Sequence, residues 1–332
     1  MPEPRYPALY QINTRVWLTE LSRALGRRAT LDDMPDSDLD RLAGMGFDWI
    51  WLLSVWRTGP VAQQISRTNP EWRREFQETL PDLREEDIAG SGFAISGYTV
   101  QPGLGGDAAL ARIRQRLRDR GLRLMLDFVP NPTAPDHPWV REHPEYYVGG
   151  SESDLARAPE NYTRVGERVL ALGRDPYFAG WPDTLQLDYS NAATQASMRG
   201  ELLRIAGQCD GVRCDMAMLV LSEVFERTWG RRAPLFWPDT TKSVRERSPG
   251  FCFMAEVYWD LEWTMQQQGL SRLRCDCRLS AGAKPSPGSF LWTTRARNRE
   301  LTGSGRLRHT IARCRSRPAP RRTQTDESRG TW

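Results

Sequence analysis

The sequence predicts an α/β fold, namely an incomplete (β/α)8 TIM barrel with an inserted subdomain after the third strand and an irregular basic tail. The first observation is a unit that recurs over about residues 8–258, in which a helix and a glycine precede a short apolar strand that ends near a polar group. Apolar strands separated by helices favour parallel pairing with both faces covered. The second observation is that acidic residues end several strands, which is where barrels place their active sites.

A doubly wound sheet is the other arrangement that repeated βα units suggest. Such sheets commonly bind dinucleotides through a G-x-G-x-x-G turn after the first strand. No such turn follows the strand expected at residues 9–13. This favours the barrel over a dinucleotide-binding domain.

Local patterns predict the individual elements. Ser37 and Asp107 can cap two helices, and further helices are expected near residues 193–206 and 239–247. Gly121 suits the position just after a helix, where a left-handed backbone is common. The five strands are expected at 9–13, 48–54, 122–129, 212–216 and 251–257.

One connection is too long for a plain loop. About sixty residues rich in Pro, Tyr, Trp and Gly separate the third strand from the next helix, and structureless loops of that length are unusual in compact domains. We expect residues 130–182 to form an inserted subdomain over the active-site face. The predicted domains are a partial barrel catalytic domain over 1–269, which contains this insertion, and a tail over 270–332.

The charge of the chain is divided unevenly. Residues 270–332 hold 14 Arg and one Lys against four acidic residues, a net charge of +11, whereas residues 1–269 carry −7 and the whole chain +4. The helix–strand rhythm also stops abruptly at Gly269-Leu270. We therefore predict a non-native or disordered Arg-rich tail, and our hypothesis for its origin is a reading-frame shift in a GC-rich gene.

Composition favours a globular protein with a buried core over a membrane or secreted protein. Hydrophobic residues make up 39% of the chain and there are 13 Trp, so a sizeable core can be buried. No apolar run reaches the roughly 18 residues of a transmembrane helix, and the amino terminus lacks the pattern of a secretory signal. These features predict a cytoplasmic protein with no membrane partner, and the six cysteines do not suggest a disulfide framework.

Two acidic residues stand at the ends of apolar, strand-like segments. Asp215 ends the segment 211–215, and Glu256 ends the segment 253–256. Two carboxylates at the ends of neighbouring strands are what cleavage of a glycosidic bond requires. Arg213 lies two positions before Asp215, so both side chains leave the strand on the same face, where the guanidinium would keep that carboxylate ionised.

Five motifs occur in chain order. They are Tyr10-Gln11-Ile12-Asn13, Asp127-Phe128-Val129-Pro130-Asn131, Trp181-Pro182-Asp183-Thr184-Leu185 with Asp188-Tyr189, Gly211-Val212-Arg213-Cys214-Asp215, and Glu256 in the segment FMAEVYW. Together they resemble the α-amylase family, glycoside hydrolase family 13, over residues 1–269. The resemblance implies an α-glucoside hydrolase or transglycosylase that acts by a retaining double displacement.

The resemblance also implies roles for individual residues. Asp215 would be the nucleophile and Glu256 the acid/base. Arg213 and Asp127 would contact the bound sugar, and Phe93 would provide an aromatic platform for its ring. The expected partner is an α-glucan or α-glucoside substrate.

Asn131 matches a family position that often ligates a structural Ca²⁺. A plain turn-forming asparagine is the alternative, because calcium takes about six to eight oxygen ligands. The implied mechanism requires no cofactor.

The chain departs from the family pattern in three places. Pro132 stands where the family has a sugar-contacting histidine, and Gly97-Tyr98 lacks an acid that often precedes the tyrosine. No Asn-His-Asp-like motif follows Glu256, since the only later histidine, His309, is not followed by an acid. A barrel that lacks its last strands exposes edges, so we expect impaired activity and poor solubility.

Two other functions are consistent with parts of the sequence. The first is an inactive carbohydrate-binding remnant, which would keep the aromatic residues and the insertion without turnover. The second is nucleic-acid binding through the basic tail. Clustered arginines alone give salt-sensitive, nonspecific phosphate binding, and the sequence contains no nucleic-acid-binding motif, so no specific nucleic-acid partner is expected.

Overall fold

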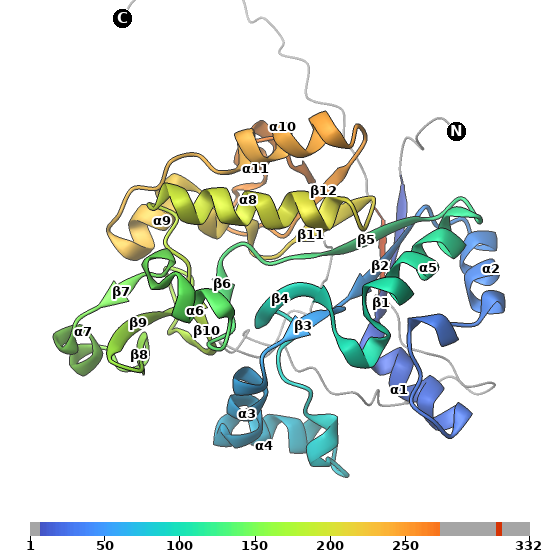
Figure 1. Ribbon diagram of the computed structural model, residues 1–332, viewed down its shortest axis with the longest axis horizontal. Coiled ribbons are helices and arrows are strands. Elements are labelled where there is room, and N and C mark those ends of the chain that lie inside the picture. The colour runs from blue at the N-terminus through green and yellow to red at the C-terminus, as the bar shows by residue number, and fades with distance from the viewer. Residues whose placement is uncertain (1–6, 273–309, 314–332) are drawn as a thin grey trace, which may run out of the picture.

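The computed structural model describes residues 7–272 and 310–313, whose main feature is a seven-stranded sheet (Figure 1). In the order β13-β12-β11-β5-β2-β1-β14, the first six strands run parallel and β14 pairs antiparallel with β1. The strands are β1 (Ala8–Asn13), β2 (Trp49–Leu53), β5 (Arg123–Phe128), β11 (Gly211–Cys214), β12 (Cys252–Ala255), β13 (Ser271–Arg272) and β14 (Thr310–Arg313). Over the described residues the sheet does not close, because β13 and β14 are its two ends.

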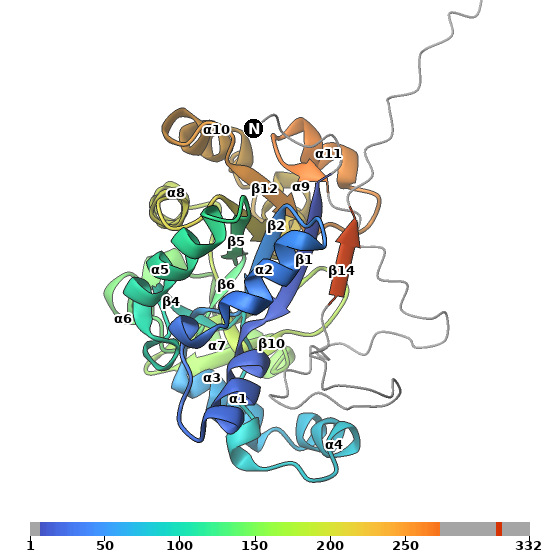
Figure 2. The same ribbon diagram turned by 90° about the vertical axis from the view of Figure 1, so that its right-hand side faces the viewer.

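Helices follow the strands along the chain, as the repeating unit predicts. Figure 2 shows α2, α5, α8 and α10 one after another around the outer side of the sheet. Their bounds are α2 (Asp36–Gly44), α5 (Gly106–Arg118), α8 (Ala192–Ala206) and α10 (Trp237–Arg247). The parallel pairing and the four helices between the strands agree with the sequence analysis.

Several elements were not expected from the sequence. They are the helices α1 (Thr14–Leu25), α3 (Pro60–Thr68), α4 (Pro70–Thr79), α9 (Ser222–Trp229) and α11 (Glu262–Gln267), the hairpin of β3 (Trp56–Thr58) and β4 (Ile95–Val100), and the 3-10 helices η1 (Leu31–Asp33), η2 (Glu85–Asp87), η3 (Pro102–Leu104) and η5 (Ala217–Val220). Asn13 explains why the sequence analysis did not predict α1. It is the last residue of β1 and also caps α1, since its side chain accepts a hydrogen bond from the amide of Val16, so no loop separates the two elements.

The sheet has a separate apolar layer on each face. Alternate residues such as Ile12, Ile50 and Leu124 belong to the large core under the helices. The opposite side chains form a second buried cluster, made of Leu9, Trp49, Trp51, Leu53, Met125 and Met254. Burial on both faces explains why these strands read as nearly continuous apolar runs.

Residues of the expected insertion form a sheet of their own. Its strands follow the order β6-β10-β9-β7, and β8 pairs with β9. The elements are β6 (Pro132–Thr133), α6 (Pro138–Glu142), η4 (Pro144–Tyr146), β7 (Gly149–Gly150), α7 (Glu152–Arg157), β8 (Tyr162–Val165), β9 (Arg168–Gly173) and β10 (Trp181–Gln186). The pairing of β6 with β10 continues to Gln186, past the boundary of 182 expected from the sequence.

Part of the tail is ordered differently from the expectation. The sequence predicts an irregular segment over 270–332, yet β13 extends the parallel sheet beside β12, and β14 pairs with β1. Backbone pairing with an existing strand edge requires no helix–strand rhythm in the sequence, which is why the pattern did not show these strands. The rest of the tail, and with it the frame-shift hypothesis, lies outside the described residues.

No helix within the described ranges is long and apolar enough to cross a membrane.

A half-buried carboxylate joins α5 to the start of two strands. Asp210 accepts hydrogen bonds from Arg114 at 2.7 Å, Arg118 at 2.8 Å and the amide of Leu124 at 2.9 Å. Burial acts to raise the pKa of Asp210, but the bonds from Arg114, Leu124 and Arg118 outweigh it and hold this pKa below its usual value. The ionised form is therefore stabilised in the folded state.

We predict that Asp210→Asn lowers the free energy of unfolding by about 1.5–3 kcal/mol at pH 7, the usual value of a hydrogen bond to a charged group. Because the folded-state pKa is depressed, this contribution is complete above the unfolded pKa of about 4 and disappears as pH falls through the folded value. Urea unfolding at pH 7, 5 and 3.5 measures it. Asp119→Asn, an exposed carboxylate that contacts Gln115, is the control, and equal effects of both changes at pH 7 would contradict the prediction.

Candidate active site

The predicted catalytic residues lie at the carboxyl ends of β5, β11 and β12. In the sheet register, Arg213 is paired with Asp127 on β5 and with Met254 on β12. Side chains two positions apart point to the same face of a strand. Asp215 therefore lies on the same face as Arg213, and Glu256 on the same face as Met254, so one edge of the sheet gathers the charged groups.

Arg213 joins the two predicted catalytic carboxylates directly. Its Nη1 donates a hydrogen bond to Oδ1 of Asp215, and its Nη2 lies 2.6 Å from Oε2 of Glu256. The three side chains are 9%, 13% and 14% exposed, so this ion bridge is largely shielded from water. Both carboxylates thus contact one planar guanidinium through different nitrogens.

Glu256 is fixed by two further donors. The amide of Met216 donates to Oε2 at 2.9 Å, and the hydroxyl of Tyr258 donates to Oε1 at 2.9 Å. Met216 adopts a left-handed backbone with φ of 41°, which is uncommon for a residue with a side chain. Strained backbone of this kind often persists at functional sites, and here the strained residue supplies the amide that contacts Glu256.

Asp127 is fully buried beside the ion bridge. Its two oxygens accept hydrogen bonds from Nε1 of Trp51 at 3.1 Å and from the amide of Ser54 at 2.8 Å. Burial raises the pKa of Asp127 to about 6, against the opposing effect of Arg213. Ser54 has a φ of 65°, so a second left-handed residue directs its amide to a site carboxylate.

Burial and charge act in opposite directions on the ion bridge. Burial raises the pKa of Asp215, although Arg213 acts to lower it. Burial also acts to lower the pKa of Arg213, but Glu256, Asp215 and Asp127 outweigh it and raise this pKa above the usual value. Arg213 therefore stays charged, while burial makes Asp215 and Asp127 hold a proton more readily than usual, against the expectation that Arg213 keeps Asp215 ionised.

Two aromatic rings contact Arg213. Its guanidinium carbon lies 5.1 Å from the ring centroid of Phe93 and 5.4 Å from that of Trp51. The platform predicted from the sequence, Phe93, thus lies beside the ion bridge, and its contact with a sugar stays a prediction. Trp51 was missed, although the alternation in Asp48-Trp49-Ile50-Trp51 could have placed it on the same face as the strand-end acids.

Asn131, for which the resemblance implies a Ca²⁺ ligand, is buried and bonded within the protein. Its side chain is 1% exposed, and Oδ1 accepts a hydrogen bond from Nε2 of Gln186 at 2.9 Å. Over residues 7–272 no group of three or more His, Cys, Asp and Glu side chains is arranged to hold a metal ion. The donors around Asn131 therefore do not fit an oxygen cage of the kind calcium requires, and no chemical step is assigned to a metal.

Pro132 stands at the position where the family pattern has a histidine that contacts the sugar. It is buried in β6 and paired with Gln186 of β10. Its ring cannot donate a hydrogen bond to a sugar. His137 instead caps α6, where its side chain accepts from the amide of Trp139, so it does not replace the missing donor.

Comparison with known proteins shows similarity to α-amylases. The family described as alpha amylase, catalytic domain, matches residues 36–163. An α-amylase from Lactobacillus plantarum superposes with a TM-score of 0.53 at 23% identity, over 81% of this chain and 49% of that one. Residues 36–163 are thus similar to the catalytic domain of α-amylases, and the solved structure shares its fold.

Curated proteins similar to this chain are named alpha-1,4-glucan:maltose-1-phosphate maltosyltransferase. The protein from Arcanobacterium haemolyticum is 31% identical over 42% of this chain and 19% of its own length. That from Bifidobacterium longum is 32% identical over 66% of this chain and 25% of its own length. The chain thus matches about a fifth to a quarter of the length of these relatives.

We predict that Arg213→Met destabilises the protein by about 3–5 kcal/mol at pH 7, because removal of one partner leaves buried carboxylates without compensation. The loss should be smaller at pH 5, since the carboxylate pKa values rise in the variant and protonation then relieves the repulsion. Urea unfolding at both pH values measures the effect.

Arg213→Lys is the matched control, because it keeps the positive charge but not the two-pronged contact. Its free energy of unfolding should lie between those of the wild type and Arg213→Met. A loss for Arg213→Met that is the same at pH 5 and pH 7 would show that the charge of Arg213 is not what stabilises the site.

Proposed function

We propose that this chain acts on α-glucosidic bonds as a hydrolase or transglycosylase of the α-amylase type, by a retaining double displacement. The observation that carries the proposal is the contact of Arg213 with both Asp215 and Glu256. Retaining enzymes hold their two carboxyl groups about 5–5.5 Å apart, and two carboxylates on one guanidinium, at the ends of adjacent parallel strands, are compatible with that spacing.

In the first step, Asp215 attacks the anomeric carbon. A bond from its carboxylate oxygen to that carbon forms while the bond from the carbon to the leaving oxygen breaks. Glu256 donates its proton to the leaving oxygen. Arg213 orients the nucleophile, and the product of this step is a covalent glycosyl ester on Asp215.

In the second step, Glu256 acts as the base. It removes a proton from water or from a sugar hydroxyl, whose oxygen attacks the same carbon and displaces Asp215. Water gives hydrolysis, and a sugar gives transfer. Asp127, held by Trp51 and Ser54, is proposed to contact the hydroxyls of the bound sugar beside this carbon.

The rim near Glu256 supports a sugar as the substrate. Tyr177 and Trp259 meet edge to face with ring centroids 4.9 Å apart, and Tyr177 is 55% exposed. Tyr258, which donates to Glu256, is 46% exposed. Aromatic faces pack against the apolar faces of sugar rings. The names of the relatives, alpha-1,4-glucan:maltose-1-phosphate maltosyltransferase, support an α-glucan as the substrate and transfer as one outcome.

A second candidate is carbohydrate binding without turnover. Pro132 favours it, because a buried proline ring stands where the family uses a histidine as a donor to the sugar. Loss of a hydrogen bond that strengthens in the transition state lowers the rate more than the affinity. In this second proposal the same residues bind a glucan and turn it over poorly.

Covalent trapping tests the proposed mechanism. With α-maltosyl fluoride, Glu256→Gln should accumulate a maltosyl ester, because fluoride needs little acid assistance to leave while deglycosylation lacks its base. Intact mass and peptide mapping should place one maltosyl group on the peptide that contains Asp215. Asp215→Asn should carry none, and Asp119→Asn should turn over like the wild type.

The outcomes separate the candidates. A label on another residue, or equal labelling of Asp215→Asn, would contradict the assigned roles. Maltose binding by the wild type and by Asp215→Asn with equal affinity, without ester or product from either protein, would instead establish the binding function.

A further inference from the structure

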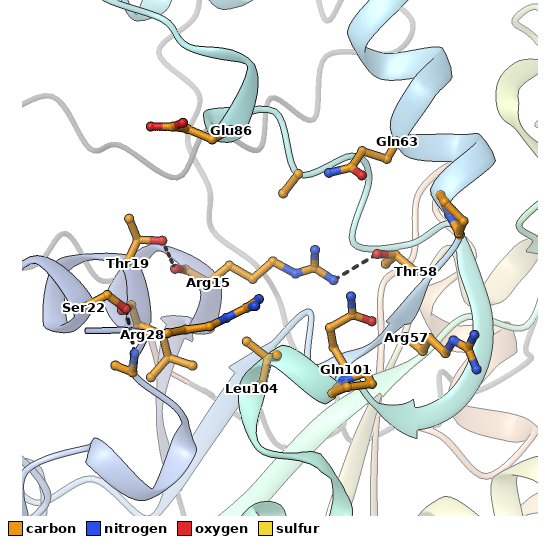
Figure 3. Close-up of a pocket in the computed structure, with 17 residues that line it drawn as sticks. Arg15, Thr19, Ser22, Arg28, Arg57, Thr58, Gln63, Glu86, Gln101 and Leu104 are labelled. Carbon is orange, nitrogen blue, oxygen red and sulfur yellow. Dashed lines mark hydrogen bonds between the residues drawn. The ribbon is translucent and has the colours of Figure 1, made fainter. Parts of the chain in front are cut away.

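A cavity lies between α1, the β3–β4 hairpin and η3 (Figure 3). Its volume is about 650 Å³. Three arginines line it, namely Arg15, Arg28 and Arg57, together with a single acid, Glu86. We call it the Arg15 pocket. Its polar lining is rich in donors, and its charge is positive.

Among the described residues, no carboxylate contacts the guanidinium of Arg15. Its Nε donates to the carbonyl of Ser54 at 3.2 Å, and its Nη2 donates to the carbonyl of Trp56 at 3.4 Å and to Oγ1 of Thr58 at 3.2 Å. All three acceptors are neutral. Burial lowers the pKa of Arg15 to about 10. Charges that are partly removed from water are normally paired, so this half-buried guanidinium is a site where an anion would be stabilised.

Arg28 reaches the pocket beside Arg15. Figure 3 shows its guanidinium pointing into the cavity below that of Arg15, while Arg57 lies at the edge. Gly103 leaves room for Arg28, since an added Cβ would stand 2.1 Å from Nη2. Within residues 7–272, no carboxylate contacts Arg15, Arg28 or Arg57.

Glu86 does not neutralise this cluster. Its Oε1 lies 3.6 Å from Nη1 of Arg84, and its side chain is 75% exposed. In Figure 3 it stands across the cavity from Arg15, with its carboxylate directed away. The interior of the pocket therefore keeps its positive charge.

Two neutral groups provide contacts for hydroxyls. Oε1 of Gln101 is buried without a donor among the described residues, and Figure 3 shows this side chain extending toward Arg15. The hydroxyl of Thr58 accepts from Arg15, which leaves its own hydrogen free to donate. A buried acceptor without a donor is costly, and a turn of the Gln101 amide toward the cavity would let it accept from a ligand hydroxyl.

We propose that the Arg15 pocket binds a phosphorylated monosaccharide, with the phosphate on Arg15 and Arg28 and a sugar hydroxyl on Gln101. Planar guanidinium groups match the oxygens of phosphate in charge and geometry. The cavity is larger than an inorganic ion requires and falls within the roughly 300–1,000 Å³ of small-molecule sites.

The Arg15 pocket is distinct from the catalytic site but adjoins it through one residue. The carbonyl of Ser54 accepts from Arg15, and the amide of Ser54 donates to Asp127. Ser54 thus lies between the two sites. The binding proposed here needs neither Asp215 nor Glu256, so it stands whether or not the glycosidase mechanism holds.

Isothermal titration of the full chain with glucose 6-phosphate, inorganic phosphate and glucose tests the proposal. Glucose 6-phosphate should bind most tightly and glucose should not bind. Arg28→Gln should weaken glucose 6-phosphate about tenfold or more, the usual cost of a charge-assisted contact. Because the side chain of Arg28 is exposed, the Arg28→Gln variant should have the same unfolding midpoint as the wild type. Arg141→Gln, whose side chain is 86% exposed on α6, is the control and should bind like the wild type.

Three results would overturn the proposal: no binding of glucose 6-phosphate, equal weakening by Arg28→Gln and Arg141→Gln, or equal affinity for phosphate and glucose 6-phosphate. The last result would leave the pocket as a site for the inorganic ion alone. Asp215→Asn should bind glucose 6-phosphate like the wild type, which separates a failure of this proposal from a failure of the catalytic one.

Discussion

The buried guanidinium of Arg213 is the group on which the site depends. It contacts Asp215 and Glu256 through different nitrogens, and Asp127 lies on the neighbouring strand. Removing a cation and several carboxylates from water is costly, and only close contact between them offsets that cost. The arrangement is therefore stable only when all members are present. The same contact that balances the charges holds two carboxylates at one spot, which is the geometry that glycoside chemistry uses.

The parallel register of β5, β11 and β12 creates this contact. Arg213 faces Asp127 on one side and Met254 on the other, and a slip of one residue would turn each of these side chains to the opposite face. Apolar layers on both faces of the sheet oppose such a slip. Packing of residues far from the charges thus determines where the charges meet, and the left-handed turns at Ser54 and Met216 add the backbone donors.

The sequence predicted the parts of the fold that depend on apolar periodicity. Strands at the five expected places and helices between them follow from it, and strand ends located Asp215 and Glu256. The periodicity could not show which backbone amides turn toward the carboxylates, because the left-handed conformations of Ser54 and Met216 depend on tertiary contacts. It also missed the Arg15 pocket, whose side chains come from α1, η3 and the β3–β4 hairpin. The catalytic roles and domain boundaries remain predictions.

A double-mutant cycle tests the importance of the ion bridge most directly. The free energy of unfolding is measured for the wild type, Arg213→Met, Glu256→Gln and the double variant at pH 7. If Arg213 and Glu256 balance each other, the double change should cost less than the sum of the single changes by more than about 1 kcal/mol. Costs that add within about 0.5 kcal/mol would show that the two groups are energetically independent and would contradict this account of the site.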